Sequence, residues 1–190
     1  ERSFFFPPPF LQAAQTASLS LSPSTTTVNI GNTFTVNIQL NTGGNTTDGV
    51  DVYLLRYNPT LLEVQDADPI ATGIQIQAGA LYPNTLTNIV NSANGTIDFS
   101  QTSLGGSAFN GSGTLATIAF KALALGAASV NFDFTLGSSI DSNVASAGLD
   151  VLASVTNGSY SISAGDTALP TISNVQVASI TQTQATVSWN

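Results

Sequence analysis

The chain has 190 residues, of which 42% are hydrophobic and only 7% are charged, and its formal net charge at pH 7 is −8. This acidic balance argues against nucleic acid or an anionic membrane surface as a partner, because both are bound through clustered Lys and Arg. The absence of His and Cys excludes Ser-His and Cys-His nucleophilic catalysis and the usual zinc sites. No apolar run reaches the roughly 18 residues that a membrane span needs.

Residues 1–15 form a Phe/Pro-rich N-terminal extension, in which Phe4, Phe5, Phe6 and Phe10 flank three prolines. The prolines disfavour a helix. The segment is either the remnant of a secretory signal, because its end resembles a small-residue cleavage region, or a retained donor segment. A retained segment would need a pocket for its phenylalanines on a neighbouring molecule, because exposed Phe side chains are unfavourable in water.

Residues 16–163 show repeated strand patterns and no sustained helical period, which predicts an antiparallel all-β sandwich or barrel. Residues 33–40 alternate apolar and polar side chains, while residues 50–57 read as apolar on both faces. We therefore expect an opening hairpin whose second strand is central in the sandwich. Further strands are expected at residues 128–136 and in a last hairpin across Asn157-Gly158.

Arg56 is one of only three basic residues in the chain and lies inside the apolar run of residues 50–57. Its aliphatic stem can lie along apolar surface while the guanidinium reaches a carboxylate such as Asp51 or Glu63. The alternative is a solvated charge at the edge of a sheet.

Four segments have the order and spacing of one known family: VNIGNTFTV (28–36), VYLLRYNPTLLEV (52–64), GTLATIAFKA (113–122) and NGSYSI (157–162). Through them the chain resembles a cohesin domain, the jelly-roll module with which bacterial cellulosomes hold dockerins. The resemblance implies an antiparallel jelly-roll β-sandwich and a dockerin-like partner, but no short motif carries individual contact residues. Leu54-Leu55 makes the second segment one residue longer than is usual in the family, which predicts a β-bulge.

Residues 164–170 read as a linker, and residues 171–190 resemble the first two strands of a fibronectin type III domain, with Trp189 at its core position. Two strands cannot bury their own apolar face. The segment therefore either belongs to a longer protein or pairs with another molecule. The candidate assembly residues of both ends are Phe4, Phe5, Phe6, Phe10, Ile172, Val175, Val177, Val187 and Trp189.

Calcium is the one cofactor that the sequence leaves open, because loop carboxylates and amides provide the oxygen ligands that calcium prefers. No twelve-residue helix-flanked calcium loop is present, so solvated loop acids are the alternative. The candidate ligands are Asp48, Asp51, Asp66, Asp68, Asp141 and Asn143.

Four asparagines match the N-glycosylation acceptor pattern. Three of them precede a glycine, so a turn is the simpler explanation of those three. The candidates are Asn45, Asn94, Asn110 and Asn157.

The sequence also contains residues for three further kinds of site, which it favours less: a catalytic carboxylate pair, a sugar-binding surface and an isopeptide link. Asp98 and Asp133 could form a glycosidase-like carboxylate pair, but they alternate with core residues, so no enzyme activity is expected. Exposed aromatic side chains could bind a sugar, and Lys121 could form a Lys-Asn isopeptide link of the pilin kind. The aromatic candidates are Tyr53, Tyr57, Tyr82 and Tyr160.

The function that the sequence favours is inferred from the apolar segments at the two termini. Both ends carry apolar segments that a complete central sandwich does not need, which favours donor-strand exchange between copies of the chain. The first prediction is thus an extracellular structural subunit that self-assembles into a surface filament or layer. The alternative is a non-catalytic binding module at the cell surface, for a dockerin-like protein or a polysaccharide. Sparse charge with abundant Ser, Thr and Asn is typical of such surface proteins.

Overall fold

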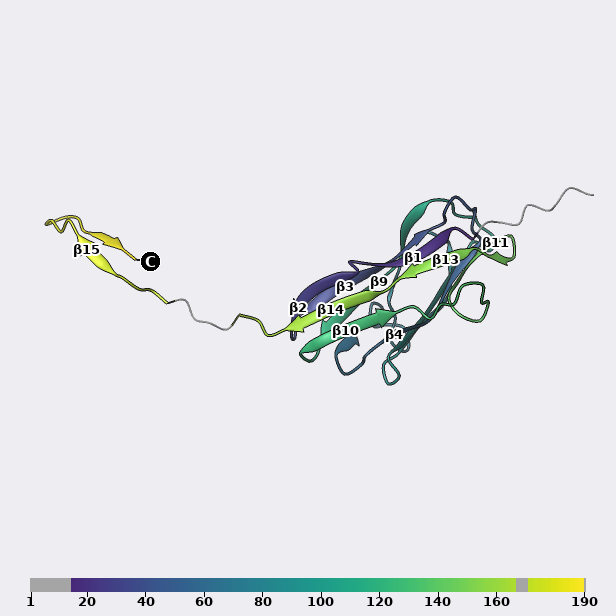
Figure 1. Ribbon diagram of the computed structural model, residues 1–190, viewed down its shortest axis with the longest axis horizontal. Helices are drawn as coiled ribbons and strands as arrows, with labels where there is room; N and C mark the ends of the chain where they lie inside the picture. The colour runs from purple at the N-terminus through teal and green to yellow at the C-terminus, as the bar shows by residue number, and fades with distance from the viewer. Residues whose placement is uncertain (1–14, 167–170, 190) are drawn as a thin grey trace, which may run out of the picture.

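The computed structural model describes residues 15–166 and 171–189. The regular elements of the described residues are all β-strands, as the lack of a helical period in the sequence predicts. Two sheets pack face to face into a sandwich, and a small hairpin follows it in the chain (Figure 1). The expected all-β sandwich is confirmed.

The first sheet has the strand order β13-β1-β3-β9-β5, with the short β6 also paired to β9. Its central strand β3 pairs antiparallel with β1 on one side and with β9 on the other. The strands of this sheet are β1 (Ala17–Ser22), β3 (Thr33–Asn41), β5 (Leu62–Val64), β6 (Gln77–Ala78), β9 (Ser112–Ala122) and β13 (Leu152–Thr156).

The second sheet is organised around β4. One edge of β4 pairs with β8 along most of its length, and the other edge pairs with β11 near its start and with β10 near its end. The strands of this sheet are β2 (Thr25–Asn29), β4 (Gly49–Tyr57), β7 (Asn84–Asn91), β8 (Thr96–Thr102), β10 (Gly126–Asn131), β11 (Asn143–Ser146), β12 (Leu149–Asp150) and β14 (Gly158–Ser163).

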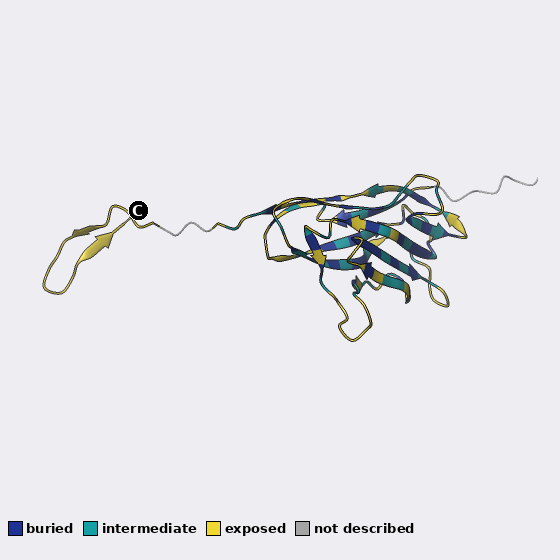
Figure 2. Cartoon of the chain, turned by 90° about the horizontal axis from the view of Figure 1, so that it is seen from below, coloured by how far each residue is buried: buried dark blue, intermediate teal, exposed yellow. Residues whose placement is uncertain are grey.

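The core lies between the two sheets, where buried residues alternate with less buried ones along the longer central strands such as β3 and β9 (Figure 2). This follows from the alternation of side chains along a β-strand. Aromatic rings fill the centre: the ring centroids of Phe34 and Tyr160 are 5.1 Å apart, and those of Tyr57 and Phe120 are 5.5 Å apart. Among the described residues, the core cluster is made of residues of the sandwich.

Neither the opening hairpin nor the hairpin across Asn157-Gly158 forms. β3 and β4 are consecutive in the chain but belong to different sheets, as do β13 and β14. Instead, the two ends of the sandwich run next to each other and pass together from the first sheet to the second. β1 runs parallel to β13, and then β2 runs parallel to β14. The turn residues predicted hairpins from local sequence. The predictions were wrong because local sequence carries no information on these long-range pairings.

The predicted bulge in β4 is confirmed, and it corrects the expectation that this strand is apolar on both faces. The register with β8 shifts between Val52 and Leu55, and Leu54 has a φ of 47°. The extra residue reverses the alternation, so that Val52 before the bulge and Leu55 and Tyr57 after it all point into the core. The strand therefore has one buried face and one outer face.

The strand expected at residues 128–136 is also shorter than predicted, because β10 ends at Asn131. The backbone N–H of Phe132 donates to Oδ1 of Asn157 over 2.9 Å instead of to a neighbouring strand. Phe132 remains buried and Phe134 packs against the core. The apolar alternation continues past the strand end because a loop also needs anchoring side chains.

The C-terminal segment forms a hairpin of β15 (Gln176–Ala178) and β16 (Thr186–Ser188), in which Val177 lies opposite Val187. Every residue of both strands is exposed, as Figure 2 shows. This agrees with the physical expectation that two strands cannot bury their own apolar face.

Candidate partner-binding face

The bulge of β4 shapes the outer face of the second sheet. Tyr53 and Leu54 both lie opposite Asp98 of β8, since the register moves from Val52 opposite Phe99 to Leu55 opposite Ile97. The backbone N–H of Leu54 donates to Oδ1 of Asp98 over 2.9 Å. A bulge of this kind re-aims side chains, and here it sets Tyr53 and Leu54 together opposite Asp98.

A second carboxylate, that of Asp51, lies close to Asp98 on the same face. Asp51 is opposite Ser100 of β8 and opposite Asn143 of β11. Burial, together with the nearby negative charge of Asp98, raises the pKa of Asp51 above its ordinary value. The two acids thus repel each other at neutral pH, and partial burial weakens the screening of that repulsion.

Apolar side chains border the two carboxylates. Ile89 of β7 lies opposite Asp98 and is 59% exposed, and Tyr53 is 42% exposed. We call Asp51, Tyr53, Asp98 and Ile89 the acidic patch. The first three residues are predicted from the sequence in separate roles, whereas Ile89 and the grouping are not. The signal that pointed to the grouping was the extra residue at Leu54-Leu55.

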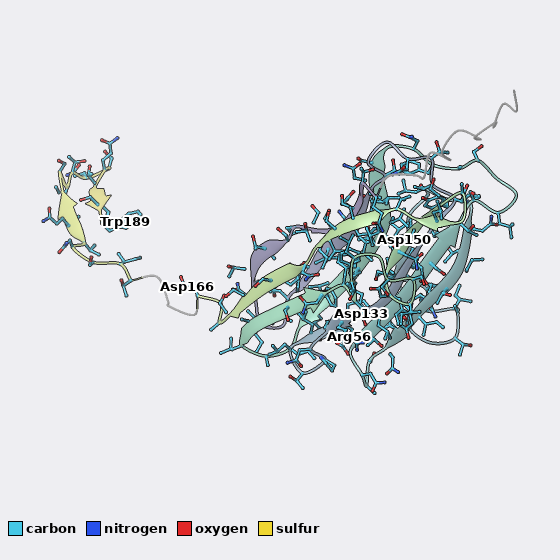
Figure 3. The ribbon with its side chains drawn as sticks, turned by 45° about the vertical axis from the view of Figure 1, so that its right-hand side comes forward. Arg56, Asp133, Asp150, Asp166 and Trp189 are labelled. Carbon is cyan, nitrogen blue, oxygen red and sulfur yellow. The ribbon has the colours of Figure 1, made fainter. Side chains whose placement is uncertain are left out.

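The sequence suggested that Arg56 reaches Asp51 or Glu63. In the structure it pairs with Asp133 instead. Its guanidinium lies 2.9 Å from Oδ2 of Asp133, and Figure 3 shows the two side chains together. The reason is the strand pairing, because Arg56 lies opposite Asn131, the last residue of β10, and Asp133 follows in the adjoining loop. The two acids weighed as a glycosidase-like pair have separate partners, because Asp133 pairs with Arg56 and Asp98 accepts from the backbone N–H of Leu54.

Comparison with models of known protein families gives one match, and it covers most of the chain: the cohesin domain model matches residues 19–162. The chain belongs to the cohesin family. No curated protein matches this cohesin.

Solved cohesins share its fold at low sequence identity. The cohesin CaCohA2 from Clostridium acetobutylicum is 17% identical, with a TM-score of 0.60 over 80% of this chain and 96% of that chain. The seventh ScaB type I cohesin from Pseudobacteroides cellulosolvens is 20% identical, with a TM-score of 0.59 over 78% and 93%. Coh-OlpA, solved in a type I cohesin–dockerin complex from Clostridium thermocellum, is 16% identical, with a TM-score of 0.59 over 77% and 99%.

The tyrosines of this cohesin do not form the exposed plane that sugar binding needs. Tyr57, Tyr82 and Tyr160 are buried, and Tyr53 alone among the four candidates is exposed. Tyr160 donates from its hydroxyl to the carbonyl of Pro23 over 3.0 Å. The apolar pattern of residues 50–57 placed both Tyr53 and Tyr57 in the core; this is right for Tyr57 but wrong for Tyr53, which lies on the outer face at the bulge.

The calcium candidates are divided among separate places. Asp66 and Asp68 share a loop, where Oδ1 of Asp66 accepts from the backbone N–H groups of Asp68 and Gln75, both over 3.1 Å. Oδ2 of Asp48 accepts from the N–H of Ala147 over 2.7 Å. In the described part of the chain, no three Asp, Glu, His or Cys side chains form a group that could hold a metal ion. Calcium binding stays a prediction.

Asp141 and Asn143 form a third group, at the entrance of β11. Asp141 is buried; its Oδ2 accepts from the N–H of Thr135, while Oδ1 has no hydrogen-bond partner among the described residues. The side-chain amide of Asn143 donates to the carbonyl of Asp141 over 3.1 Å. These contacts hold the loop against β11.

Three of the four glycosylation candidates use their side chains within the fold. The Asn45 amide donates to Thr42 over 3.0 Å, the Asn110 amide donates to Gly44 over 2.9 Å, and Asn157 accepts from Phe132. Asn94 lies exposed in the turn between β7 and β8. Glycosylation stays a prediction, with Asn94 the best placed of the four.

The remaining predicted sites are placed as follows. Lys121 lies opposite Thr33 and Glu63 on its two neighbouring strands, neither of which is the Asn that an isopeptide link needs. The N-terminal assembly candidates lie outside the described residues; they are Phe4, Phe5, Phe6 and Phe10.

Within the described ranges, the structure has no helix of the length and apolarity of a membrane span. Of the assembly candidates, Ile172, Val175, Val177, Val187 and Trp189 are all exposed.

Proposed function

We propose that this cohesin is a non-catalytic binding module, working outside the cell or at its surface, that holds a dockerin-like protein. The observation that carries the proposal is the family match over residues 19–162. The solved complex of Coh-OlpA with a dockerin adds support, because the folds are alike. Of the two functions that the sequence predicts, these findings favour the binding module over the filament subunit.

The outer face of β4, β7 and β8 suits a protein partner. It combines exposed apolar side chains, such as Tyr53 and Ile89, with the carboxylates of Asp51 and Asp98. Protein interfaces of standard size combine a partly apolar centre with polar groups over about 800 Å² on each partner. A flat sheet face can offer such an area without rearrangement, whereas a polysaccharide would gain little from a single exposed tyrosine.

The filament hypothesis keeps one observation in its favour, the exposed apolar residues of the C-terminal hairpin. Ile172 is 66% exposed and Trp189 is 61% exposed. A fibronectin type III-like continuation, or donation of a strand to a neighbouring copy, would cover them. Both remain proposals, with less support than the dockerin-like partner.

The two functions are separated by size-exclusion chromatography followed by calorimetric titration with a panel of dockerin modules. We expect the full chain to elute as a monomer, to bind one of these modules with one-to-one stoichiometry and to gain thermal stability in its presence. Polymers that disappear when residues 1–15 are deleted, without binding to any dockerin, would support the filament subunit instead. Titration with cellulose provides the polysaccharide control.

A further inference from the structure

One strand of the first sheet is interrupted by an exposed loop. β5 and β6 pair with successive stretches of the same edge of β9, so the residues between them leave that edge and rejoin it. Residues 66–73, which we call the flap, are all exposed. The flap contains the one Asp-Pro pair of the sequence, Asp68-Pro69. The peptide bond of such a pair joins a carbonyl group next to a carboxylate side chain to the readily protonated nitrogen of a proline.

The carboxylate of Asp68 is turned back toward the backbone that follows it. Its Oδ1 accepts from the backbone N–H of Ile70 over 3.2 Å, so the side chain bridges the bond to Pro69. An aspartate that accepts from the backbone two residues on forms an Asx turn. This hydrogen bond engages one carboxylate oxygen and leaves the other, Oδ2, to act as a nucleophile.

The carbonyl group of the same peptide bond is engaged as well. The backbone N–H of Ala71 donates to the carbonyl oxygen of Asp68 over 3.1 Å. A donor at a carbonyl oxygen stabilises the negative charge that develops there during nucleophilic attack. Asp66 holds the start of the flap, since its Oδ1 accepts from the N–H groups of Asp68 and Gln75, both over 3.1 Å. The flap therefore fixes the nucleophile and the carbonyl group at one peptide bond.

We propose that the Asp68–Pro69 bond is a self-cleavage site of the flap. Oδ2 of Asp68 attacks the backbone carbonyl carbon of the same residue and forms a five-membered cyclic anhydride. The bond to the Pro69 nitrogen breaks, and this nitrogen takes up a proton from the solvent and leaves as a secondary amine. Water then opens the anhydride, which restores the side-chain carboxyl group and leaves a second carboxyl group as the new chain end. The net reaction is hydrolysis, in which one water molecule is consumed and nothing is oxidised or reduced.

Both sides of the flap are anchored, so the cleaved cohesin stays folded as two associated chains. Before the flap, Val64 of β5 is buried in the core. After it, Ile76 is buried, and its backbone exchanges hydrogen bonds of 2.9 and 2.7 Å with the side chain of Asn88 on β7. The N–H of Val90 also donates to the carbonyl of Ile74 over 3.0 Å. Exposed loop tips are the places where a chain tolerates such a break.

Mass spectrometry under denaturing conditions detects the cleavage directly. The full chain is incubated in mildly acidic buffer, which supplies the proton for the Pro69 nitrogen, and the products are followed over time. We expect one break, which gives residues 1–68 and 69–190. The Asn58–Pro59 bond is an internal control that should stay intact, because Asn58 has no carboxylate.

Three variants separate this chemistry from ordinary proteolysis. Asp68→Asn removes the nucleophile and should lower the cleavage rate by more than about tenfold, because a positioned intramolecular nucleophile is far more effective than water. Pro69→Ala removes the readily protonated nitrogen and should slow the reaction in the same way. Asp68→Glu keeps the charge but needs a six-membered anhydride, so it should also cleave more slowly. Glu63→Gln on β5 is the matched control and should cleave at the rate of the parent chain.

Size-exclusion chromatography in native buffer shows whether the cleaved protein stays together. We expect the two chains to elute as one species and to separate only in denaturant. An intact Asp68–Pro69 bond, or an equal cleavage rate in Asp68→Asn, would overturn the self-cleavage site. Chains that separate in native buffer would overturn the two-chain fold. These outcomes are independent of the proposed binding module, because the reaction involves no dockerin-like partner.

Discussion

At the scale of single residues, burial changes the meaning of side chains that the sequence presents alike. The four tyrosines are equally suited to sugar binding by type, but Tyr160 is almost fully buried against Phe34, and its hydroxyl donates to the carbonyl of Pro23. Burial raises its pKa to about 12. This side chain therefore joins β14 to the turn between β1 and β2.

Replacing Tyr160 with Phe tests that link. We expect a loss of about 1 kcal/mol in the free energy of unfolding at pH 7, the usual contribution of one hydrogen bond. Above pH 10 the unfolded tyrosine ionises while the folded one stays protonated to about pH 12, so folding stability falls across this window.

The Tyr160→Phe variant should lose stability less steeply between pH 10 and 12, measured by urea unfolding. Part of the slope should remain, because burial also raises the pKa of Tyr57 and Tyr82. Tyr53→Phe is the matched control and should leave the midpoint at pH 7 unchanged. An unaltered alkaline slope in Tyr160→Phe would contradict the burial argument.

Asp51 illustrates the opposite case, a residue that costs stability. Its pKa is raised by burial and by Asp98, so its stabilising contribution is present below the unfolded pKa and is lost as the pH rises through the folded one. Across β4 it faces the uncharged Asn143, and Arg56 on the same strand is occupied by Asp133.

We therefore expect Asp51→Asn to raise the thermal midpoint at pH 7 and to leave it unchanged at about pH 3, where the acid is protonated in both states. Differential scanning calorimetry at the two pH values measures this. Glu63→Gln should not reproduce the gain at pH 7. A lower midpoint for Asp51→Asn at neutral pH would show that the ionised carboxylate stabilises the fold.

At the scale of elements, the turn between β7 and β8 is attached to the end of β4. The N–H of Tyr57 donates to the carbonyl of Gly95 over 2.8 Å. Gly95 has a φ of 65°, and a Cβ there would collide with the carbonyl oxygen of Tyr57. The turn thus requires glycine both for its conformation and for its close approach to β4.

Gly95→Ala tests this attachment against Gly31→Ala. Gly31 also has a positive φ, 84°, but has open space where a Cβ would lie. We expect Gly31→Ala to cost about 1 kcal/mol of unfolding free energy from backbone strain alone, and Gly95→Ala to cost clearly more. Denaturant unfolding of both variants gives the comparison, and equal losses would mean that the collision is relieved without cost.

At the scale of the whole molecule, the chain closes its sandwich with its own first and last strands. β1 and β13 pair in one sheet and β2 and β14 pair in the other, so contacts between the two ends of residues 16–163 complete both layers. The C-terminal hairpin contributes no buried residue to that core. The folding unit should therefore be independent of residues 167–190.

A chain ending at Asp166 is expected to unfold cooperatively with the midpoint of the full chain, because residues 171–189, the described part of what is removed, are all exposed. A peptide of residues 171–189 alone should be largely unfolded in water. Circular dichroism during heating measures both. A markedly lower midpoint in the shortened chain would show that the hairpin packs on the sandwich.

The candidate site was only partly predictable. The extra residue at Leu54-Leu55 indicated a bulge in β4, and the structure confirms it. The sequence could not show that the bulge sets Tyr53 and Leu54 opposite Asp98, or that Ile89 also lies opposite Asp98, because β7 and β8 lie far from β4 in the chain. Arg56 was assigned to the wrong acids for the same reason, since Asp133 comes from a distant loop.

The sequence by itself determined that this protein is an all-β sandwich, since apolar alternation with period two and turn residues are local properties of the chain. Its family was also readable from four short segments. Only the tertiary structure decided which sheet each strand joins, which tyrosines are buried and which charges meet. Those outcomes depend on pairings between distant segments, whose free energy comes from contacts that no local pattern encodes.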